Sequence, residues 1–365
     1  MKRVFYIILC ISFMGCSGST DDSNVISPTE HDDIAIEDID TVMIETPGTS
    51  REFPYLFPSL DYSEEHFVGL DERTGSINIY NLPELTHRTS IPLHQEGPHE
   101  IQKNMIGAIY YHNNDSIFIL QHMPNRLLII NDDSEIIWRL DLKDEFSKEP
   151  AWKDWMAYGW FDRIGIYFKN NKLYFAIGQN LVEKDYTQPM VGYYDFDAHS
   201  VSFLDISYPD FFTSDGLIGY YNYPGITFFQ DEIIITYPYS SEIFIYDLEG
   251  HLKKSITSLP NMKTGKAQAP DEETMAHFQA NPFYMEVKPI QNGKYFLRHG
   301  NDPEPDDPEN TIYKYTILYN SDFTKYSIIR KNEKPVSFGG EYIYYPLAQE
   351  VSEYQLLERY KIRMD

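Results

Sequence analysis

The sequence predicts an all-β fold, a six-bladed β-propeller with four antiparallel strands per blade and a ring closed by an N-terminal strand. Three observations lead to this fold class. The chain of 365 residues contains 30 Tyr and 22 Phe but only 11 Ala, a composition that favours strands over helix bundles. Short apolar or alternating segments recur between polar turns, and the pattern returns at intervals of roughly 50 residues. A long β-sandwich with similar strand spacing is the alternative.

The first sixteen residues have the pattern of a bacterial export signal. Lys2 and Arg3 are basic, residues 4–13 are apolar, and Gly15 stands directly before Cys16. The apolar run is too short to span about 30 Å of hydrocarbon, which indicates a cleaved signal and not an anchor helix. The ending resembles a bacterial lipobox, in which residues 1–15 form the lipoprotein signal peptide and Cys16 carries the lipid. The alternative is an ordinary secretory signal that leaves Cys16 free.

The cysteine count favours lipidation. The other cysteine, Cys10, lies inside the signal, so Cys16 has no partner for an internal disulfide. We therefore expect the lipid on Cys16 to anchor the protein to the outer membrane of the cell envelope. Asp21-Asp22 resemble the acidic signal that sends Bacteroidota lipoproteins to the outer leaflet, but ordinary linker charges explain them equally well. Periplasmic and surface-facing locations both stay open.

Residues 16–35 are expected to form an acidic flexible tether, and residues 36–365 the propeller. Between residues 17 and 50 there are nine acids and neither Lys nor Arg, as in a solvated linker. Removal of the signal takes Lys2 and Arg3 from the 30 basic residues, which leaves 28 against 56 acids and a net charge of −28. So acidic a molecule repels phosphate backbones, which argues against nucleic-acid binding.

The repeating unit is a meander of short strands. The second strands of the six units contain, in order, Phe67, Ile117, Leu173, Ile233, Tyr295 and Tyr342. In five units the third strand ends in a polar residue that begins a turn: Asn81, Asn131, Asp195, Asp247 and Asn320. Asn and Asp suit this place because the side chain can bond the backbone two residues further on.

The last unit is one strand short, since the chain ends after the segment 354–362. Near the start, residues 39–46 form a strand that belongs to no complete unit. We therefore expect this N-terminal strand to complete the C-terminal blade and close the ring.

Several of these motifs resemble a known family. They are the lipobox, the strand 39–46, Glu96-Gly97-Pro98, Asp115-Ser116-Ile117-Phe118, and Tyr237-Pro238-Tyr239 followed by Glu242-Ile243-Phe244-Ile245-Tyr246-Asp247. The sequence is similar to an uncharacterised family of Bacteroidota lipoproteins that is grouped with six-bladed propellers of the NHL and TolB-like kind. The likeness covers most of residues 36–365 and implies the fold. The family supplies no catalytic residues.

The predicted loops are unequal in length. In a four-stranded meander, the turn between the first and second strands and the turn between the third and fourth strands lie on one face of the ring. In this sequence these turns are short. The connections of the other face are long: 94–105, 141–163, 178–189, 208–224, 258–281 and 299–310. Because loops on a rigid scaffold carry function, we expect ligands to bind on this long-loop face, above the central channel.

Three tryptophans fall within nine residues of one long connection. Trp152, Trp155 and Trp160 could stack on sugar rings or anchor a protein partner. The alternative is that a short helix lays its apolar side on the propeller rim.

Arg163 begins a first strand, and Arg298-His299 end a second strand, so all three are expected at the upper mouth of the channel. An arginine there can hold a carboxylate or phosphate with two parallel hydrogen bonds. The alternative is a structural arginine that binds blade carbonyls or an acidic neighbour.

The sequence contains no metal-binding or catalytic motif that we recognise, and no cofactor is expected. Asp302, Glu304 and Asp306 alternate as in a calcium loop, but the glycine and the final glutamate of that loop are missing. The leading hypothesis is therefore a lipid-anchored, non-catalytic binding or scaffold module that takes a protein or a small anionic or saccharide ligand. The alternative is a hydrolase or lyase acting on a saccharide or ester, with His299 or an acid from residues 301–309 as the proton carrier.

Overall fold

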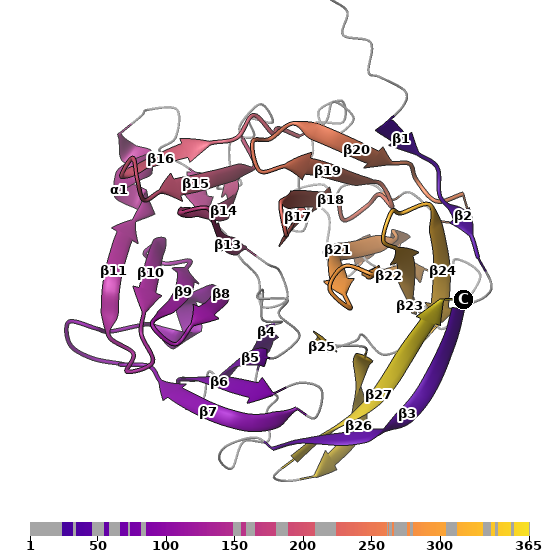
Figure 1. Ribbon diagram of the computed structural model, residues 1–365, viewed down its shortest axis with the longest axis horizontal. Helices are drawn as coiled ribbons and strands as arrows, with labels where there is room; N and C mark the ends of the chain where they lie inside the picture. The colour runs from indigo at the N-terminus through magenta and orange to yellow at the C-terminus, as the bar shows by residue number, and fades with distance from the viewer. Residues whose placement is uncertain are drawn as a thin grey trace, which may run out of the picture.

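The computed structural model describes residues 24–31, 34–45, 55–57, 66–71, 74–81, 85–148, 155–157, 165–179, 189–208, 224–260, 262, 265, 276–277, 280–303, 312–330, 337–339, 342–351 and 354–364. Within these residues the strands form six sheets around a central axis (Figure 1). Each sheet is a blade with an antiparallel core of four strands, which confirms the six-bladed propeller. No helix in the described part is long and apolar enough to cross a membrane.

The strands follow one another outward from the axis in each blade. Blade 1 contains β4 (Tyr55–Phe57), β5 (His66–Asp71), β6 (Ser76–Asn81) and β7 (Thr86–Pro92). Blade 2 contains β8 (Ile106–Asn113), β9 (Ser116–Gln121), β10 (Arg126–Ile130) and β11 (Ile136–Asp141). Blade 3 contains β13 (Ile166–Lys169), β14 (Lys172–Gln179), β15 (Val191–Asp195) and β16 (Ser200–Phe203), and β12 (Trp155–Ala157) also pairs with β14.

The second half of the ring has the same order. Blade 4 contains β17 (Gly225–Phe229), β18 (Glu232–Thr236), β19 (Ile243–Asp247) and β20 (Leu252–Ile256). Blade 5 contains β21 (Phe283–Ile290), β22 (Tyr295–Pro303), β23 (Ile312–Asn320) and β24 (Lys325–Arg330). Blade 6 contains β25 (Ser337–Gly339), β26 (Tyr342–Val351), β27 (Tyr354–Met364) and β3 (Ile34–Glu45). The short helices in the described residues include a 3₁₀ turn (Lys103–Met105) and α1 (Leu142–Ser147).

The six predicted second strands are confirmed as β5, β9, β14, β18, β22 and β26. The predicted turn role of the polar residue at the end of the third strand is confirmed for Asp195 and Asp247. Oδ1 of Asp195 accepts a hydrogen bond from the N–H of Asp197 (2.9 Å), and Oδ1 of Asp247 accepts one from Glu249 (3.0 Å). A further hydrogen bond from the Ala198 N–H is the main reason why the pKa of Asp195 lies below its ordinary value.

Both faces of a blade are buried, so its inner strands are apolar at nearly every position. In β9, Ile117 and Ile119 pack with side chains of blade 1, whereas Phe118 and Leu120 pack with side chains of blade 3. The alternation of side chains along a strand sends successive residues to opposite neighbours. The core is therefore divided into layers between the blades.

Hydroxyl groups join the innermost strands of consecutive blades. The Tyr110 hydroxyl of blade 2 donates to the carbonyl of Phe168 in blade 3 (3.5 Å), and the Tyr167 hydroxyl of blade 3 donates to Gln230 in blade 4 (2.9 Å). In blade 4, Thr227 Oγ1 donates to the carbonyl of Val287 in blade 5 (2.6 Å). These bonds fix neighbouring blades next to the axis.

The ring is closed by the N-terminal strand, as predicted. β3 pairs antiparallel with β27 along almost its whole length, from Ile34 opposite Met364 to Glu45 opposite Tyr354. Arg359 of β27 also holds Asp40 of β3 with two hydrogen bonds, Nε to Oδ1 (2.8 Å) and a terminal nitrogen to Oδ2 (2.6 Å). The closing strand is longer than the predicted 39–46, because it begins at Ile34.

Part of the predicted flexible tether 16–35 is paired with the propeller in the described residues. Residues 24–31, which we call the strap, run along the outer rim, where β1 (Val25–Ile26) pairs parallel with β20 and β2 (Thr29–Glu30) pairs parallel with β24 (Figure 1). Ile26 packs on the apolar core between blades 4 and 5, and Pro28 is buried. An outer strand edge offers unpaired backbone groups, and this local hydrogen bonding outweighs the polar composition that predicts a linker.

Stepwise N-terminal truncation tests the closure. Removal of residues 1–23 is expected to leave the melting temperature unchanged, and removal of residues 1–33 to lower it slightly through loss of the strap. Removal of residues 1–46 takes away β3, exposes the edge of β27, and is expected to destabilise the fold by several kcal/mol. Thermal melts of the three truncations check this order, and equal melting of the first and third would contradict closure by β3.

Candidate functional site

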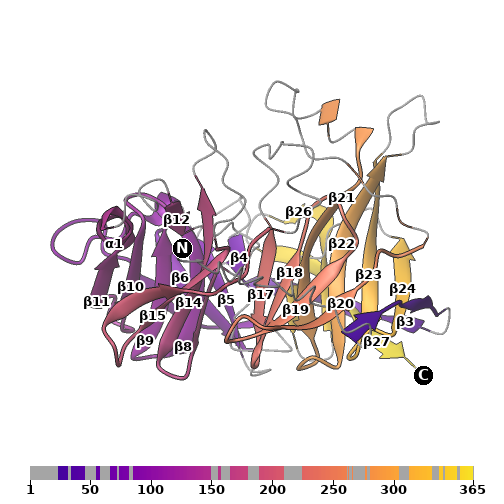
Figure 2. The same ribbon diagram turned by 90° about the horizontal axis from the view of Figure 1, so that it is seen from above.

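The long-loop face is the end of the ring at which the second strand of each blade finishes. Figure 2 views the ring from the side, with the strands crossing its thickness. Of the predicted site residues, Arg298 and His299 lie in β22, and Trp155 begins β12. Cys16, Trp152, Trp160 and Arg163 lie outside the described residues, so their predicted roles stay predictions.

A β-bulge lies at the junction between blades 4 and 5, next to this face. Tyr284 pairs with Gly300 and Val287 pairs with Arg298, so Met285 and Glu286 together stand opposite His299. A bulge removes main-chain groups from the ladder and turns side chains in new directions, and bulges are common beside functional sites. This junction is therefore the candidate site that the structure brings forward.

Arg298 is fully buried and binds the carbonyl that the bulge frees. Its Nε donates to the carbonyl of Met285 (2.7 Å), and its two terminal nitrogens donate to the carbonyls of Tyr237 (2.9 Å) and Glu242 (3.4 Å) of blade 4. The guanidinium carbon also lies 5.0 Å from the centre of the Tyr284 ring. Burial lowers the pKa of Arg298 from its ordinary value, but a guanidinium stays charged in proteins.

The loop that Arg298 binds, residues 237–242, contains part of the motif on which the family resemblance rests. Other backbone groups hold the same loop. The Tyr284 N–H donates to the carbonyl of Pro238 (2.6 Å), the Gly265 N–H donates to Tyr239 (2.8 Å), and the Leu259 N–H donates to Ser241 Oγ (2.9 Å). The motif therefore serves to join blade 4 to the segments that follow it.

These contacts agree with the alternative stated from the sequence, in which Arg298 is a structural residue that binds blade carbonyls. Each of its three nitrogen atoms donates to a backbone carbonyl on one of the two blades. Donors in such bonds are not available to an anion unless the junction opens. Anion binding by Arg298 stays a prediction, whereas its role in joining the blades is visible in the geometry.

Arg298 and His299 do not form one site. Adjacent residues of a strand point to opposite faces of the sheet. Arg298 contacts blade 4, whereas His299 is paired with Thr316, whose Oγ1 lies 3.3 Å from the Tyr345 hydroxyl of blade 6. The sequence places the two residues side by side, but the pleat directs them toward different neighbours.

Glu286 and Lys288 are further charged residues of the junction and were not among the residues selected from the sequence. The Glu286 side chain is fully buried, and Lys288 Nζ lies 3.2 Å from its Oε1. A Cβ on Gly225 of blade 4 would lie only 2.6 Å from the Glu286 Cβ, so the close approach of the two blades requires glycine there. One feature of the sequence could have pointed to these two residues: they are charged and stand at alternate positions of an otherwise apolar strand.

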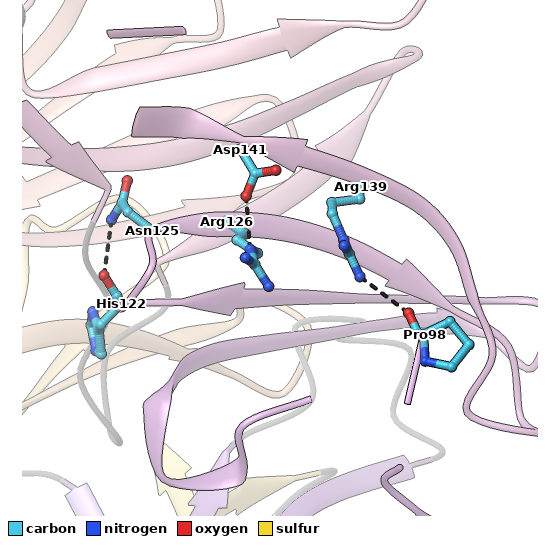
Figure 3. Close-up of polar contacts among 6 residues, drawn as sticks. All are labelled: Pro98, His122, Asn125, Arg126, Arg139 and Asp141. Carbon is cyan, nitrogen blue, oxygen red and sulfur yellow. Dashed lines mark hydrogen bonds and ion pairs between the residues drawn. The ribbon is translucent and has the colours of Figure 1, made fainter. Parts of the chain in front are cut away.

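A pair of hydrogen bonds from blade 2 positions part of the connection that contains the tryptophans. Asn125, in the turn between β9 and β10, donates from Nδ2 to the carbonyl of Ala157 (2.8 Å) and accepts from the Ala157 N–H at Oδ1 (3.2 Å). Figure 3 shows Asn125 beside His122, with the ion pair between Arg126 and Asp141 (2.7 Å) on the neighbouring strands. Asn125 thereby fixes β12, the strand that Trp155 begins, to blade 2.

The charges of the blade 4–5 junction act mainly on one another and on the backbone. Lys288 compensates Glu286, and backbone carbonyls surround Arg298. Among the residues that the structure describes, no group of three or more His, Cys, Asp or Glu side chains could hold a metal ion. The arrangement is suited to holding two blades in a fixed relation on the long-loop side of the ring.

Replacement of Arg298 by Ala is expected to destabilise the fold by about 3 kcal/mol, because a fully buried side chain is lost and the carbonyls of Met285, Tyr237 and Glu242 each lose a donor. Arg298→Lys should restore little, since one ammonium group cannot span the three acceptors. Denaturant unfolding measures both changes. Arg139→Ala is the control: this exposed arginine makes one long bond to the Pro98 carbonyl (3.4 Å; Figure 3) and should change stability by less than about 0.5 kcal/mol. An unchanged unfolding midpoint for Arg298→Ala would contradict the structural role.

Comparison with known proteins agrees with this fold. A member of the DUF4221 family from Bacteroides vulgatus superposes with a TM-score of 0.67 at 14% sequence identity, over 91% of this chain and 99% of that one. A putative exported protein from Bacteroides fragilis superposes with a TM-score of 0.60 at 11% identity, over 94% of this chain and 100% of that one. No curated protein is significantly similar in sequence. The model of the family described as "Domain of unknown function (DUF4221)" matches residues 30–325, so the chain belongs to that family of six-bladed propellers.

Proposed function

We propose that this protein is a lipid-anchored β-propeller of the cell envelope that binds a partner on its long-loop face without catalysing a reaction. The observation that carries the proposal is that all three nitrogen atoms of Arg298 donate hydrogen bonds to backbone carbonyls of the blades. A buried charge held in this way stiffens the junction between blades 4 and 5. A rigid ring that presents long loops on one face is a suitable support for binding.

The non-catalytic part of the proposal draws on the charge balance at the junction. A general acid or base must reach a substrate within hydrogen-bond distance. Glu286 is fully buried and ion-paired with Lys288, and Arg298 is fully buried as well. These groups fit the joining of two blades better than proton transfer to a substrate.

The first sixteen residues and one of the structural comparisons support the proposed location of the protein. The basic start, the apolar run and Gly15-Cys16 match an exported lipoprotein. The structural relative from Bacteroides fragilis is described as a putative exported protein, which supports a location outside the cytoplasm. We propose that the lipid on Cys16 holds the propeller at the outer membrane.

The proposed partner is a protein or a small anionic or saccharide ligand. Trp152, Trp155 and Trp160 belong to the long connection between blades 2 and 3. Indole rings bind sugars and protein side chains by stacking and burial. Asn125 fixes the strand at which Trp155 stands, so this part of the connection has a defined base on blade 2.

Lipidation is tested by the variant Cys16→Ser. The wild-type protein is expected in the membrane fraction with acyl mass on Cys16, and the variant is expected either as unprocessed precursor or outside the membrane fraction. Mass spectrometry of the purified N-terminal peptide makes the measurement. Recovery of a wild-type protein that begins at another residue, with a free thiol, would reject the anchor.

Partner binding is tested by site-specific photocrosslinking in cells. A photoreactive residue at Met123, which is 64% exposed in the turn between β9 and β10 on the long-loop face, is expected to give a discrete adduct. The matched control is Asp133, exposed in the turn of the same blade on the opposite face, which should give none. Equal adducts from both positions, or an adduct only from Asp133, would contradict the assignment of the binding face.

A further inference from the structure

The strap determines where the chain leaves the propeller on its way to Cys16. Its first described residue is Asn24, beside the outer strand of blade 4. The Thr257 N–H donates to the carbonyl of Ile26 (2.9 Å), and the His31 N–H donates to the carbonyl of Tyr326 (2.8 Å). The strap is therefore bonded to blades 4 and 5 at both of its ends.

The strap also shortens the connection to the lipid. If residues 16–35 were all tether, the propeller could move freely about an anchor twenty residues away. Cys16 and Asn24 are only eight residues apart, and a fully extended chain of that length spans at most roughly 28 Å. The rim of blade 4 therefore cannot lie farther than this from a lipid on Cys16, whereas blade 1 lies on the opposite side of the ring (Figure 1).

The distribution of charged residues along the rim also favours a position of blades 4 and 5 close to the membrane. The outer strands β20 and β24 carry Lys253, Lys254 and Lys325, although Glu232 pairs with Lys253 (2.7 Å). The outer strand of blade 6, β3, carries four acids and no base: Glu37, Asp38, Asp40 and Glu45. In a mature molecule with a net charge of −28, the rim of blades 4 and 5 is thus less repelled by anionic lipid headgroups than the rim of blade 6.

From these two observations we infer that the rim of blades 4 and 5 faces the membrane surface and that blade 1 points away from it. The ring then stands on its edge, and both of its faces remain open to the surroundings. The long-loop face is accessible from the side without passing between the protein and the bilayer. This inference rests on the lipid anchoring proposed above.

The orientation can be measured on vesicles without relying on cellular lipidation. A protein that begins at Cys16 contains no other cysteine, so it can be coupled through that thiol to maleimide lipid in vesicles of phosphatidylethanolamine and phosphatidylglycerol. A dye is attached through a keto amino acid either at Leu252, in the outer strand of blade 4, or at Thr89, in the outer strand of blade 1. Both positions are exposed, which makes them a matched pair.

Energy transfer to an acceptor lipid is expected to be higher from position 252 than from position 89. Insertion of twenty Gly and Ser residues between Ser23 and Asn24 lengthens the connection and should abolish most of this difference, while melting stays unchanged. Equal transfer from the two positions, higher transfer from position 89, or a difference that the insertion leaves intact would overturn the inference. A free thiol on Cys16 in cells would instead refute the anchoring and leave the vesicle result standing.

Discussion

The pairing of β3 with β27 is the constraint on which the rest of the structure depends. Each blade packs only on its two neighbours, so five blades can assemble in sequence, but the last interface forms only when the ring closes. The last blade has three strands from the C-terminal part of the chain and takes its outer strand from the N-terminal part. This long-range pairing, together with the two bonds between Arg359 and Asp40, joins the two ends of the fold.

Within the closed ring, the junctions from blade 2 to blade 5 are fixed by different kinds of bond. Blades 2, 3 and 4 use a hydroxyl that donates to the backbone of the next blade, whereas blades 4 and 5 add a buried charge. Burying a guanidinium costs several kcal/mol unless its donors are satisfied, and the carbonyls of Met285, Tyr237 and Glu242 supply this compensation. The bulge is what makes one of these carbonyls available, so the irregular strand and the buried arginine depend on each other.

These features explain why the family motif need not be a motif of activity. A propeller fold by itself does not define a function, because unrelated sites occur on the same ring. Residues 237–242 are held by backbone and side-chain bonds from blade 5 and from the connection that leads to it. A loop with this many structural partners is constrained by assembly of the ring.

The sequence alone was sufficient to predict the blades, because the signals are local: apolar strands of even spacing, followed by Asn or Asp whose side chain closes the turn. It also predicted closure by an N-terminal strand, since counting strands left the last unit one short. The sequence identified Arg298 as a candidate but could not assign its role. Alternation along a strand predicts that Arg298 and His299 point to opposite faces of the sheet, but it does not predict which neighbouring residues each of them contacts. The bulge that buries Glu286 inserts a single residue, and no local pattern marks it. The strap was invisible for a related reason: its residues resemble a solvated linker, and only the assembled ring creates the strand edges of β20 and β24 to which they bond.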